Sequence, residues 1–407
     1  ALILPLGSVL GIIILTQIAG KVRSYEKFTV PEILGDRFGQ SARIISVIAL
    51  VIAYMVIVSY QYNAGGAVLS TILTDGQGQS LISVETGTII AAVFIVLYTM
   101  LAGLVSVAYT DVANGIIILF SFIIAIPIFL YEAGGFSGMA TSFALMGKPD
   151  HMNFWGVYST LDIINFCLPP FLLIMGDANM YQRFFASKDA EGAKSATKVL
   201  IIAVAVAELM IITAAWISSS MIPDAEVGKY VLIYASHKFL PTFIGAIMMT
   251  TIVGIIISTA DSFLLVPATT LMRDIYLNYI DPKANEKKIV LLSRVLVLIL
   301  GIIAYIVSLG FARSAGFFER ALYAYTIYGA SITPSLVAAL FWKGATKAGA
   351  VSSIVTGAVV TLLWKEAGFI RELIPSNIYN NMDEVLPAIT FSILALILVS
   401  FATKDKN

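Results

Sequence analysis

The sequence has few charged residues and almost no cysteine or histidine. Charged side chains make up 12% of the 407 residues, whereas soluble domains carry about 25%. The single cysteine excludes an internal disulfide and a cysteine-rich metal centre, and the two histidines provide no haem or zinc motif. Basic and acidic residues balance at 25 each, so no basic surface for nucleic acid is expected. We find no nucleophile–base pair and no cofactor motif, so we do not expect an enzyme.

Long apolar runs dominate what is present, since 59% of the residues are hydrophobic. A membrane helix needs about 20 apolar residues, whereas a barrel strand needs only about 10 that alternate. The sequence therefore predicts an all-α integral membrane protein in a lipid bilayer, with about eleven transmembrane helices. The predicted spans are 1–20, 43–73, 86–105, 112–132, 161–182, 197–221, 240–270, 288–310, 318–342, 347–365 and 385–402.

Lysine and arginine gather in alternate connections, after the first, fifth, seventh and ninth spans, whereas the loop at 74–85 has none. The positive-inside rule then predicts a plasma-membrane protein whose present N-terminus lies outside and whose C-terminus is cytoplasmic. The first residue already lies in an apolar run, without an initiator methionine or a basic segment. We therefore expect no signal peptide and a chain that lacks its N-terminal helix or helices.

Two spans, 43–73 and 240–270, are too long for a perpendicular crossing, lie five spans apart and run in opposite directions. A five-helix unit repeated upside down is typical of secondary transporters. We expect one transporter domain in which 1–132 is a first repeat without its opening helix, 161–342 a second repeat, and 347–402 two additional helices. Coincidence of length is the alternative explanation.

The fifth span contains Pro169-Pro170 at its centre and Gly176-Asp177 further on. Proline removes a backbone donor and bends or breaks a helix. An interrupted helix at the start of the second repeat is where a transporter is expected to bind its solute. A simple kink without a ligand is the alternative.

The seventh span places four polar side chains in an apolar helix, and a carboxylate alone costs a few kcal/mol there. Ile255, Ser258, Thr259 and Ser262 share one helical face. Sodium prefers hard oxygen ligands, which two hydroxyls and the Ile255 carbonyl would supply. Asp261 and Ser262, further toward the cytoplasm, would form a second cation position or an exit path. Alternatively, the hydroxyls bond back to their own helix or pack against a neighbour, which does not explain the carboxylate.

Asp111 opens the fourth span at the level that Asp261 approaches, and two carboxylates at one cavity repel unless a cation or proton lies between them. Alternatively, Asp111 caps its helix. We also predict that solute contacts Gln61 and Asn63 on the second span and Tyr325 on the ninth, although tyrosines in this region also suit ordinary packing.

The sequence resembles the sodium/solute symporter family over nearly the whole chain, and four motifs carry the resemblance. One looks like the family's Gly-Gly-Leu signature with alanine in place of the first glycine, and a Tyr-Thr-Asp-Val motif follows it. A third resembles the loop after the broken sixth core helix, and the last resembles a second signature with its spacing one residue off. The motifs are Tyr98-Thr99-x-x-Ala102-Gly103-Leu104-x-Ser106, Tyr109-Thr110-Asp111-Val112, Tyr181-Gln182-Arg183-x-x-Ala186-x-Lys188-Asp189, and Trp342-Lys343 with Gly349-Ala350-x-x-Ser353 and Gly357.

The resemblance implies a LeuT-type fold with a principal sodium site that joins the first core helix to the eighth. Its eighth-helix ligands correspond to the Ile255 carbonyl and the hydroxyls of Ser258 and Thr259, and the first-helix ligands would precede Ala1. Some members carry a second sodium site, whose positions correspond here to Ser258, Asp261, Ser262 and Asp111. The family leads us to expect serine where this chain has Asp261, which leaves proton coupling open.

The resemblance also bears on the solute. Sugar-transporting members place asparagine and tyrosine on the broken helix where this chain has Pro170 and Leu173, which disfavours a hexose. The resemblance implies sodium-coupled symport of a small organic solute, such as an amino acid, a carboxylate or a vitamin, by alternating access. The alternatives are a proton-coupled symporter and a membrane sensory module of a larger signalling protein.

Overall fold

The structure is a computed structural model that describes residues 5–25, 27–75, 79–101, 103–154, 156–223, 230–311, 316–379 and 381–404. Helices account for nearly all of this part, with one isolated β-bridge between Thr74 and Ser80. Eleven spans are long and apolar enough to cross a membrane. Their helices are α1 (Pro5–Arg23), α3 (Gln40–Ile72), α4 (Val84–Leu101), α5 (Leu104–Glu132), α7 (Thr160–Gly176) with α8 (Ala178–Ala186), α9 (Ala190–Met221), α12 (Thr242–Thr270), α13 (Glu286–Phe311), α14 (Phe317–Phe341), α15 (Lys347–Glu366) and α18 (Val385–Ala402).

The predicted number of spans is thus confirmed, with most boundaries shifted by a few residues. The largest shift is at the end of the seventh span, which continues ten residues beyond the predicted end at 270, and α5 begins eight residues before the predicted start at 112. The two long spans are real: α3 has 33 residues, and α12 continues into a π-helix at Leu271–Ile280. Short helices join the spans where the sequence predicted only connections: α2 (Val30–Phe38), α6 (Gly135–Leu145), η1 (Pro149–Met152), α11 (Val231–Phe239), α16 (Gly368–Leu373) and α17 (Ser376–Tyr379).

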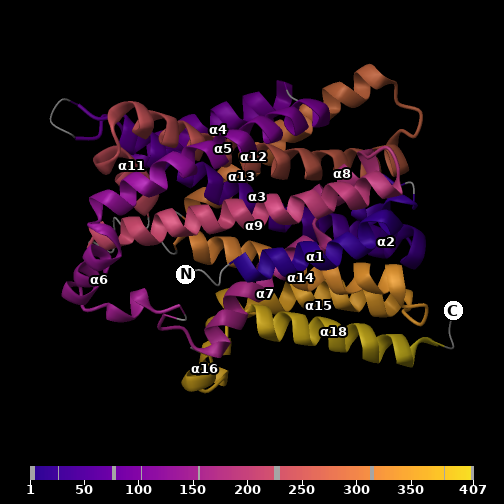
Figure 1. Ribbon diagram of the computed structural model, residues 1–407. Helices are drawn as coiled ribbons and strands as arrows, with labels where there is room; N and C mark the ends of the chain where they lie inside the picture. Colours follow the sequence, from indigo (N-terminus) through magenta and orange to yellow (C-terminus); the bar gives the residue numbers. More distant parts are fainter. Residues whose placement is uncertain are drawn as a thin grey trace.

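Helix α3 lies at the centre of the bundle. It packs against α2, α4, α12, α13 and α14, which explains why polar groups on it are buried. Its Tyr54 and Tyr62 are fully buried. Helices α15 and α18 pack side by side along one edge, and α9 runs across α1 (Figure 1). The long helices run roughly parallel, so each joins one end of the bundle to the other (Figure 1).

The fifth predicted span is interrupted, but not at the proline pair. Helix α7 continues through Pro169 and Pro170 and ends at Gly176, so the prediction of a break at the prolines is wrong. Proline's fixed φ is compatible with a helix, so tertiary packing decides whether the helix breaks. Here α1 and α14 hold α7 from two sides, and α1 approaches so closely that a Cβ on Gly7 would lie 2.1 Å from the Cys167 carbonyl oxygen.

Candidate functional site

The break between α7 and α8 lies at Asp177, whose backbone leaves the helical region at φ −59° and ψ 110°. The Asp177 carboxylate caps α8 by accepting a hydrogen bond from the Asn179 backbone N–H at 3.1 Å. Tyr54 of α3 donates its hydroxyl to the same oxygen at 2.5 Å. Tyr328 of α14 donates to the Gly176 carbonyl at 2.7 Å and accepts from the Ala178 N–H at 3.2 Å. Tyr328 therefore satisfies two backbone groups that the break exposes, and Tyr54 holds the carboxylate that caps α8.

The hydroxyls of α12 fall into two groups. Thr250, Thr251 and Thr269 each bond back to the carbonyl four residues earlier, as isolated hydroxyls in apolar helices do. Ser258 does not, because its Oγ donates to Oδ1 of Asp111 on α5. No hydrogen bond is found for the Thr259 hydroxyl within the described residues. Back-bonding, the alternative explanation for these hydroxyls, therefore accounts for other positions of α12 and not for Ser258.

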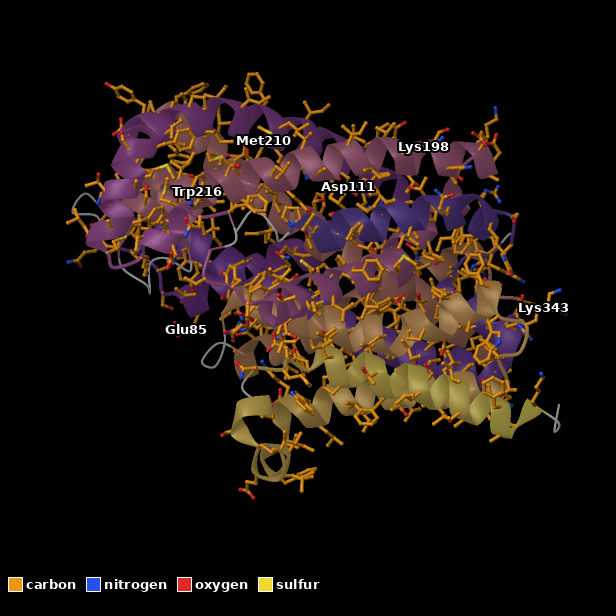
Figure 2. The ribbon with its side chains drawn as sticks, turned by 60° about the horizontal axis from the view of Figure 1, so that its bottom comes forward. Glu85, Asp111, Lys198, Met210, Trp216 and Lys343 are labelled. Atoms are coloured by element: carbon orange, nitrogen blue, oxygen red, sulfur yellow. The ribbon has the colours of Figure 1, made fainter. Side chains whose placement is uncertain are left out.

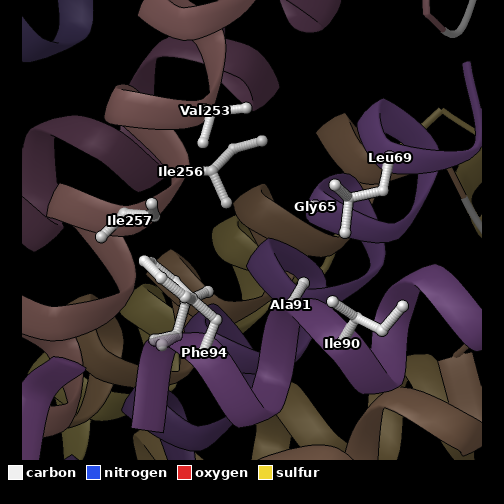
Figure 3. Close-up of a pocket in the computed structure, with 9 residues that line it drawn as sticks. Gly65, Leu69, Ile90, Ala91, Phe94, Val253, Ile256 and Ile257 are labelled. Carbon is white, nitrogen blue, oxygen red and sulfur yellow. The ribbon is translucent and has the colours of Figure 1, made fainter. Parts of the chain in front are cut away.

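A different face of α12 is entirely apolar. Val253, Ile256 and Ile257 line a cavity of about 250 Å³ together with residues of α3 and α4, and no charged or polar side chain contributes to it (Figure 3). The residues from α3 and α4 are Gly65, Leu69, Ile90, Ala91, Phe94 and Ile95. The helix thus keeps its polar groups on the side that α5 and α8 approach.

Asp111 lies inside α5 and does not cap it, since the helix begins at Leu104 with Gly103 as its N-cap. Figure 2 shows Asp111 between the two ends of the bundle. Its Oδ2 lies 2.5 Å from Nη2 of Arg183, which comes from α8 just beyond the break. The same guanidinium nitrogen lies 3.4 Å from the Ser262 hydroxyl. Arg183 is thus a cation within the cluster, and the sequence analysis did not place it there.

Asp261 is fully buried on α12, between the turns that carry Ser258 and Ser262. Within the described residues, neither of its carboxylate oxygens has a hydrogen-bond partner. A buried ion without a partner costs several kcal/mol, so such a group normally holds a cation or a proton. Asp261 therefore has unused hydrogen-bonding capacity, whereas Asp111 is paired with Arg183.

The residues predicted to bind cations offer oxygen ligands only. The hydroxyls of Ser258, Thr259 and Ser262 and the carboxylates of Asp111 and Asp261 come from two neighbouring helices, α12 and α5. Helix α12 is unbroken across Ile255, so its carbonyl would contribute the second lone pair that a helical hydrogen bond leaves free. No group of three or more histidine, cysteine or acidic residues suits a metal in the described part of the chain. This donor set fits a hard monovalent cation such as sodium.

The residues predicted to contact solute are less closely grouped. Tyr325 of α14 lies 3.3 Å from Tyr60 of α3, hydroxyl to hydroxyl. Asn63 donates instead to the Ser308 carbonyl of α13 at 3.3 Å. The others are Gln61, buried on α3, and Pro170 and Leu173 on α7, of which Leu173 is buried in the core. Tyr325 therefore contacts α3, the second span, as a shared solute site would require, whereas the Asn63 side chain is bonded to α13 instead. Ala102 of the first signature lies outside the described residues.

Comparison with known proteins gives consistent results. The family model described as the sodium:solute symporter family matches residues 2–357. The high-affinity proline transporter PutP of Bacillus subtilis is 27% identical over 399 residues, covering 95% of this chain and 80% of that protein. The osmoregulated proline transporter OpuE of the same organism is 26% identical, and a sodium/proline symporter of Haemophilus influenzae is 25% identical, each with 77% of its own length covered.

A solved structure of a Na⁺-coupled sialic acid symporter in a substrate-bound outward-open state superposes with a TM-score of 0.75 at 16% identity. The match covers 98% of this chain and 83% of that one. This likeness confirms the predicted all-α, LeuT-type fold.

Proposed function

The chain belongs to the sodium:solute symporter family, whose members couple sodium to the movement of a small organic solute, and we propose that its solute is proline or a similar small amino acid. The support is that the curated relatives cited above transport proline and align over nearly the whole chain. The buried, mostly apolar surroundings of Leu173 also suit a small solute with few polar groups.

Two cation positions on α12 would carry the coupling. The first uses the Ile255 carbonyl with the hydroxyls of Ser258 and Thr259. The second uses Asp111, Asp261 and Ser262, with Ser258 shared between the two. The observation that carries this proposal is that the Ser258 hydroxyl leaves its own helix for Asp111, while buried Asp261 has no partner among the described residues.

The solute would bind beside the α7–α8 break at Asp177, near Pro170, Leu173 and Tyr325, with Gln61 and Asn63 on the neighbouring α3. Cation binding favours one orientation of the bundle only if it is tighter in that orientation. The break joins these parts, because Asp177 contacts α3 through Tyr54 and opens the helix that carries Arg183. The end of the bundle rich in lysine and arginine would face the cytoplasm.

Uptake of radiolabelled proline into proteoliposomes tests the proposal. We expect an inward sodium gradient to drive accumulation, and Ser258→Ala with Thr259→Ala to abolish the sodium dependence. Thr250→Ala is the matched control, because that hydroxyl lies on the same helix, is exposed and bonds only to Ala246. Proline uptake that ignores sodium, or that the control impairs as much as the double variant does, would refute the site.

Proton coupling is a second candidate, favoured by the carboxylate of Asp261 alone. A pH gradient without sodium would then drive uptake, and Asp261→Asn would abolish it. If only a sodium gradient drives uptake, this candidate is excluded.

A further inference from the structure

We propose that this protein binds a phosphate-bearing anion in a basic pocket at the end of the bundle that we assign to the cytoplasm. The pocket lies between the α2–α3 corner, the loop from α14 to α15 and the end of α18. It is lined by Arg37, Phe38, Gly39, Lys343, Gly344, Ala345, Thr346, Lys347 and Lys404. It is separate from the cation cluster, none of whose residues lines it.

Charge is the first reason. Arg37, Lys343, Lys347 and Lys404 come from three segments of the chain and converge on one cavity, and no acidic residue lines it within the described part of the chain. None of the three lysine ammonium groups has a carboxylate partner within the described residues. Like charges gathered in this way repel one another, so an anion in the cavity would relieve the repulsion.

The shape of the pocket is the second reason. Its volume is about 460 Å³, and small-molecule sites usually measure about 300–1,000 Å³. Its base is buried, since Phe38, Ala345 and Thr346 are each less than a tenth exposed. The Thr346 N–H donates to Ser400 at 3.2 Å and its hydroxyl lies 2.7 Å from that of Thr403, so α18 fixes this loop. The cations therefore surround a rigid base.

Backbone geometry favours an anion in the same place. Helix α15 begins at Lys347, and the N-terminal end of a 20-residue helix carries partial positive charge. Gly39 has φ 84°, and a Cβ there would lie 3.9 Å from the Lys347 ammonium nitrogen. The positive φ favours glycine here, and it places the α2–α3 corner next to the Lys347 side chain. Arg37 donates one hydrogen bond to the Lys343 carbonyl at 2.9 Å, which holds the guanidinium at the pocket while its other donors stay available.

The shared chemistry is a phosphate group, which an anionic lipid headgroup or a soluble phosphate would supply. Basic pockets between membrane helices at the cytoplasmic surface are suited to such headgroups. Bound there, the anion would tie the α2–α3 corner to the α14–α15 loop, two segments far apart in sequence. Figure 1 shows α2, α15 and the C-terminus toward the same end of the molecule.

Titration of the purified full chain in a neutral detergent, at constant ionic strength, tests the proposal. The probes are dioctanoyl phosphatidylglycerol, dioctanoyl phosphatidylcholine and inorganic phosphate, with affinity measured by calorimetry. The test variant is Lys343→Gln with Lys347→Gln, which leaves the structural bond of Arg37 in place. The control is Lys188→Gln with Lys198→Gln, which removes the same charge from exposed positions; Figure 2 shows Lys198 and Lys343 apart from each other.

We expect phosphatidylglycerol to bind and the zwitterionic lipid not to bind. The test variant should lose about thirtyfold in affinity, at roughly 1 kcal/mol for each removed cation, and the control should bind like the native chain. Binding of phosphate without phosphatidylglycerol would support the site with a soluble ligand. Absence of binding by both anions, or equal losses in the two variants, would overturn the proposal. Unchanged thermal unfolding of the test variant without ligand verifies that it is folded.

Discussion

Replacing Asp261 by asparagine should have opposite effects on stability in the absence and in the presence of sodium. The carboxylate is fully buried and neither oxygen has a partner in the described part of the chain. Without a cation, an unsatisfied buried group costs about 1–3 kcal/mol, and more when it is charged. Asparagine has nearly the same shape and no charge. The amide leaves the same position unsatisfied but removes the charge, so in choline chloride Asp261→Asn should be more stable than the native chain by the extra cost of the charge, on the order of 1 kcal/mol.

Adding sodium should make the native chain more stable than Asp261→Asn. A ligand that binds only the folded state at 100 times its Kd adds about 2.7 kcal/mol of stability. The native chain would gain this stabilisation from sodium at the Asp261 position in addition to any from the Ser258–Thr259 position. Asp261→Asn would keep only the stabilisation from the Ser258–Thr259 position. The two stability curves, plotted against sodium concentration, should then cross.

The assay is unfolding of the detergent-solubilised chain by SDS, followed by circular dichroism at one pH over a sodium series at constant ionic strength. Thr250→Ala serves as the control, and it should follow the native curve. If Asp261→Asn is less stable than the native chain without sodium, the carboxylate is not an unsatisfied charge. If sodium stabilises both proteins equally, Asp261 does not bind it.

Two further substitutions, each with a companion variant, test packing elsewhere in the bundle. Asp274 is fully buried and lies 2.5 Å from the Arg43 guanidinium, so Asp274→Asn should lower the free energy of unfolding by about 3–5 kcal/mol. Adding Arg43→Met should recover part of this loss. A double variant whose loss equals the sum of the two single losses would contradict the pairing. Gly349→Ala places a Cβ 2.0 Å from the Ser400 hydroxyl, so overpacking of α15 on α18 should lower the free energy of unfolding by about 1–3 kcal/mol. Gly115→Ala is the control and should leave stability unchanged, because there is open space around that position. Unfolding in SDS measures both.

The positions of the spans could be predicted from the sequence because each depends on the chain's own apolar length. The repetition of a long helix, at 43–73 and 240–270, was visible for the same reason. The polar face of α12 could also be predicted, since a helical period fixes which residues lie together. These are local properties, and the structure agrees with them at α3 and α12.

The remaining features depend on how helices meet. Arg183 follows Asp111 by 72 residues, and the packing of both α8 and α5 against α12 brings its guanidinium to the carboxylate. The position of the break depends on Tyr54 and Tyr328, which bond to Asp177 and to the ends of the broken helix from two other spans. No local pattern distinguishes these tyrosines from ordinary packing groups, so the sequence favoured the proline pair.

The presence of Arg183 in the cluster has a consequence for how many cations it can hold. With both carboxylates ionised, Asp111 and Asp261 contribute two negative charges and Arg183 one positive charge, which leaves one negative charge uncompensated. At the second cation position, a single monovalent ion brings these three side chains to neutrality, and another ion there would leave them positive in a medium that penalises net charge. The arginine thereby sets the charge that the second position can accept as well as its geometry, and losing that side chain would leave the two carboxylates with charge for two ions at that position, where the native chain is balanced by one.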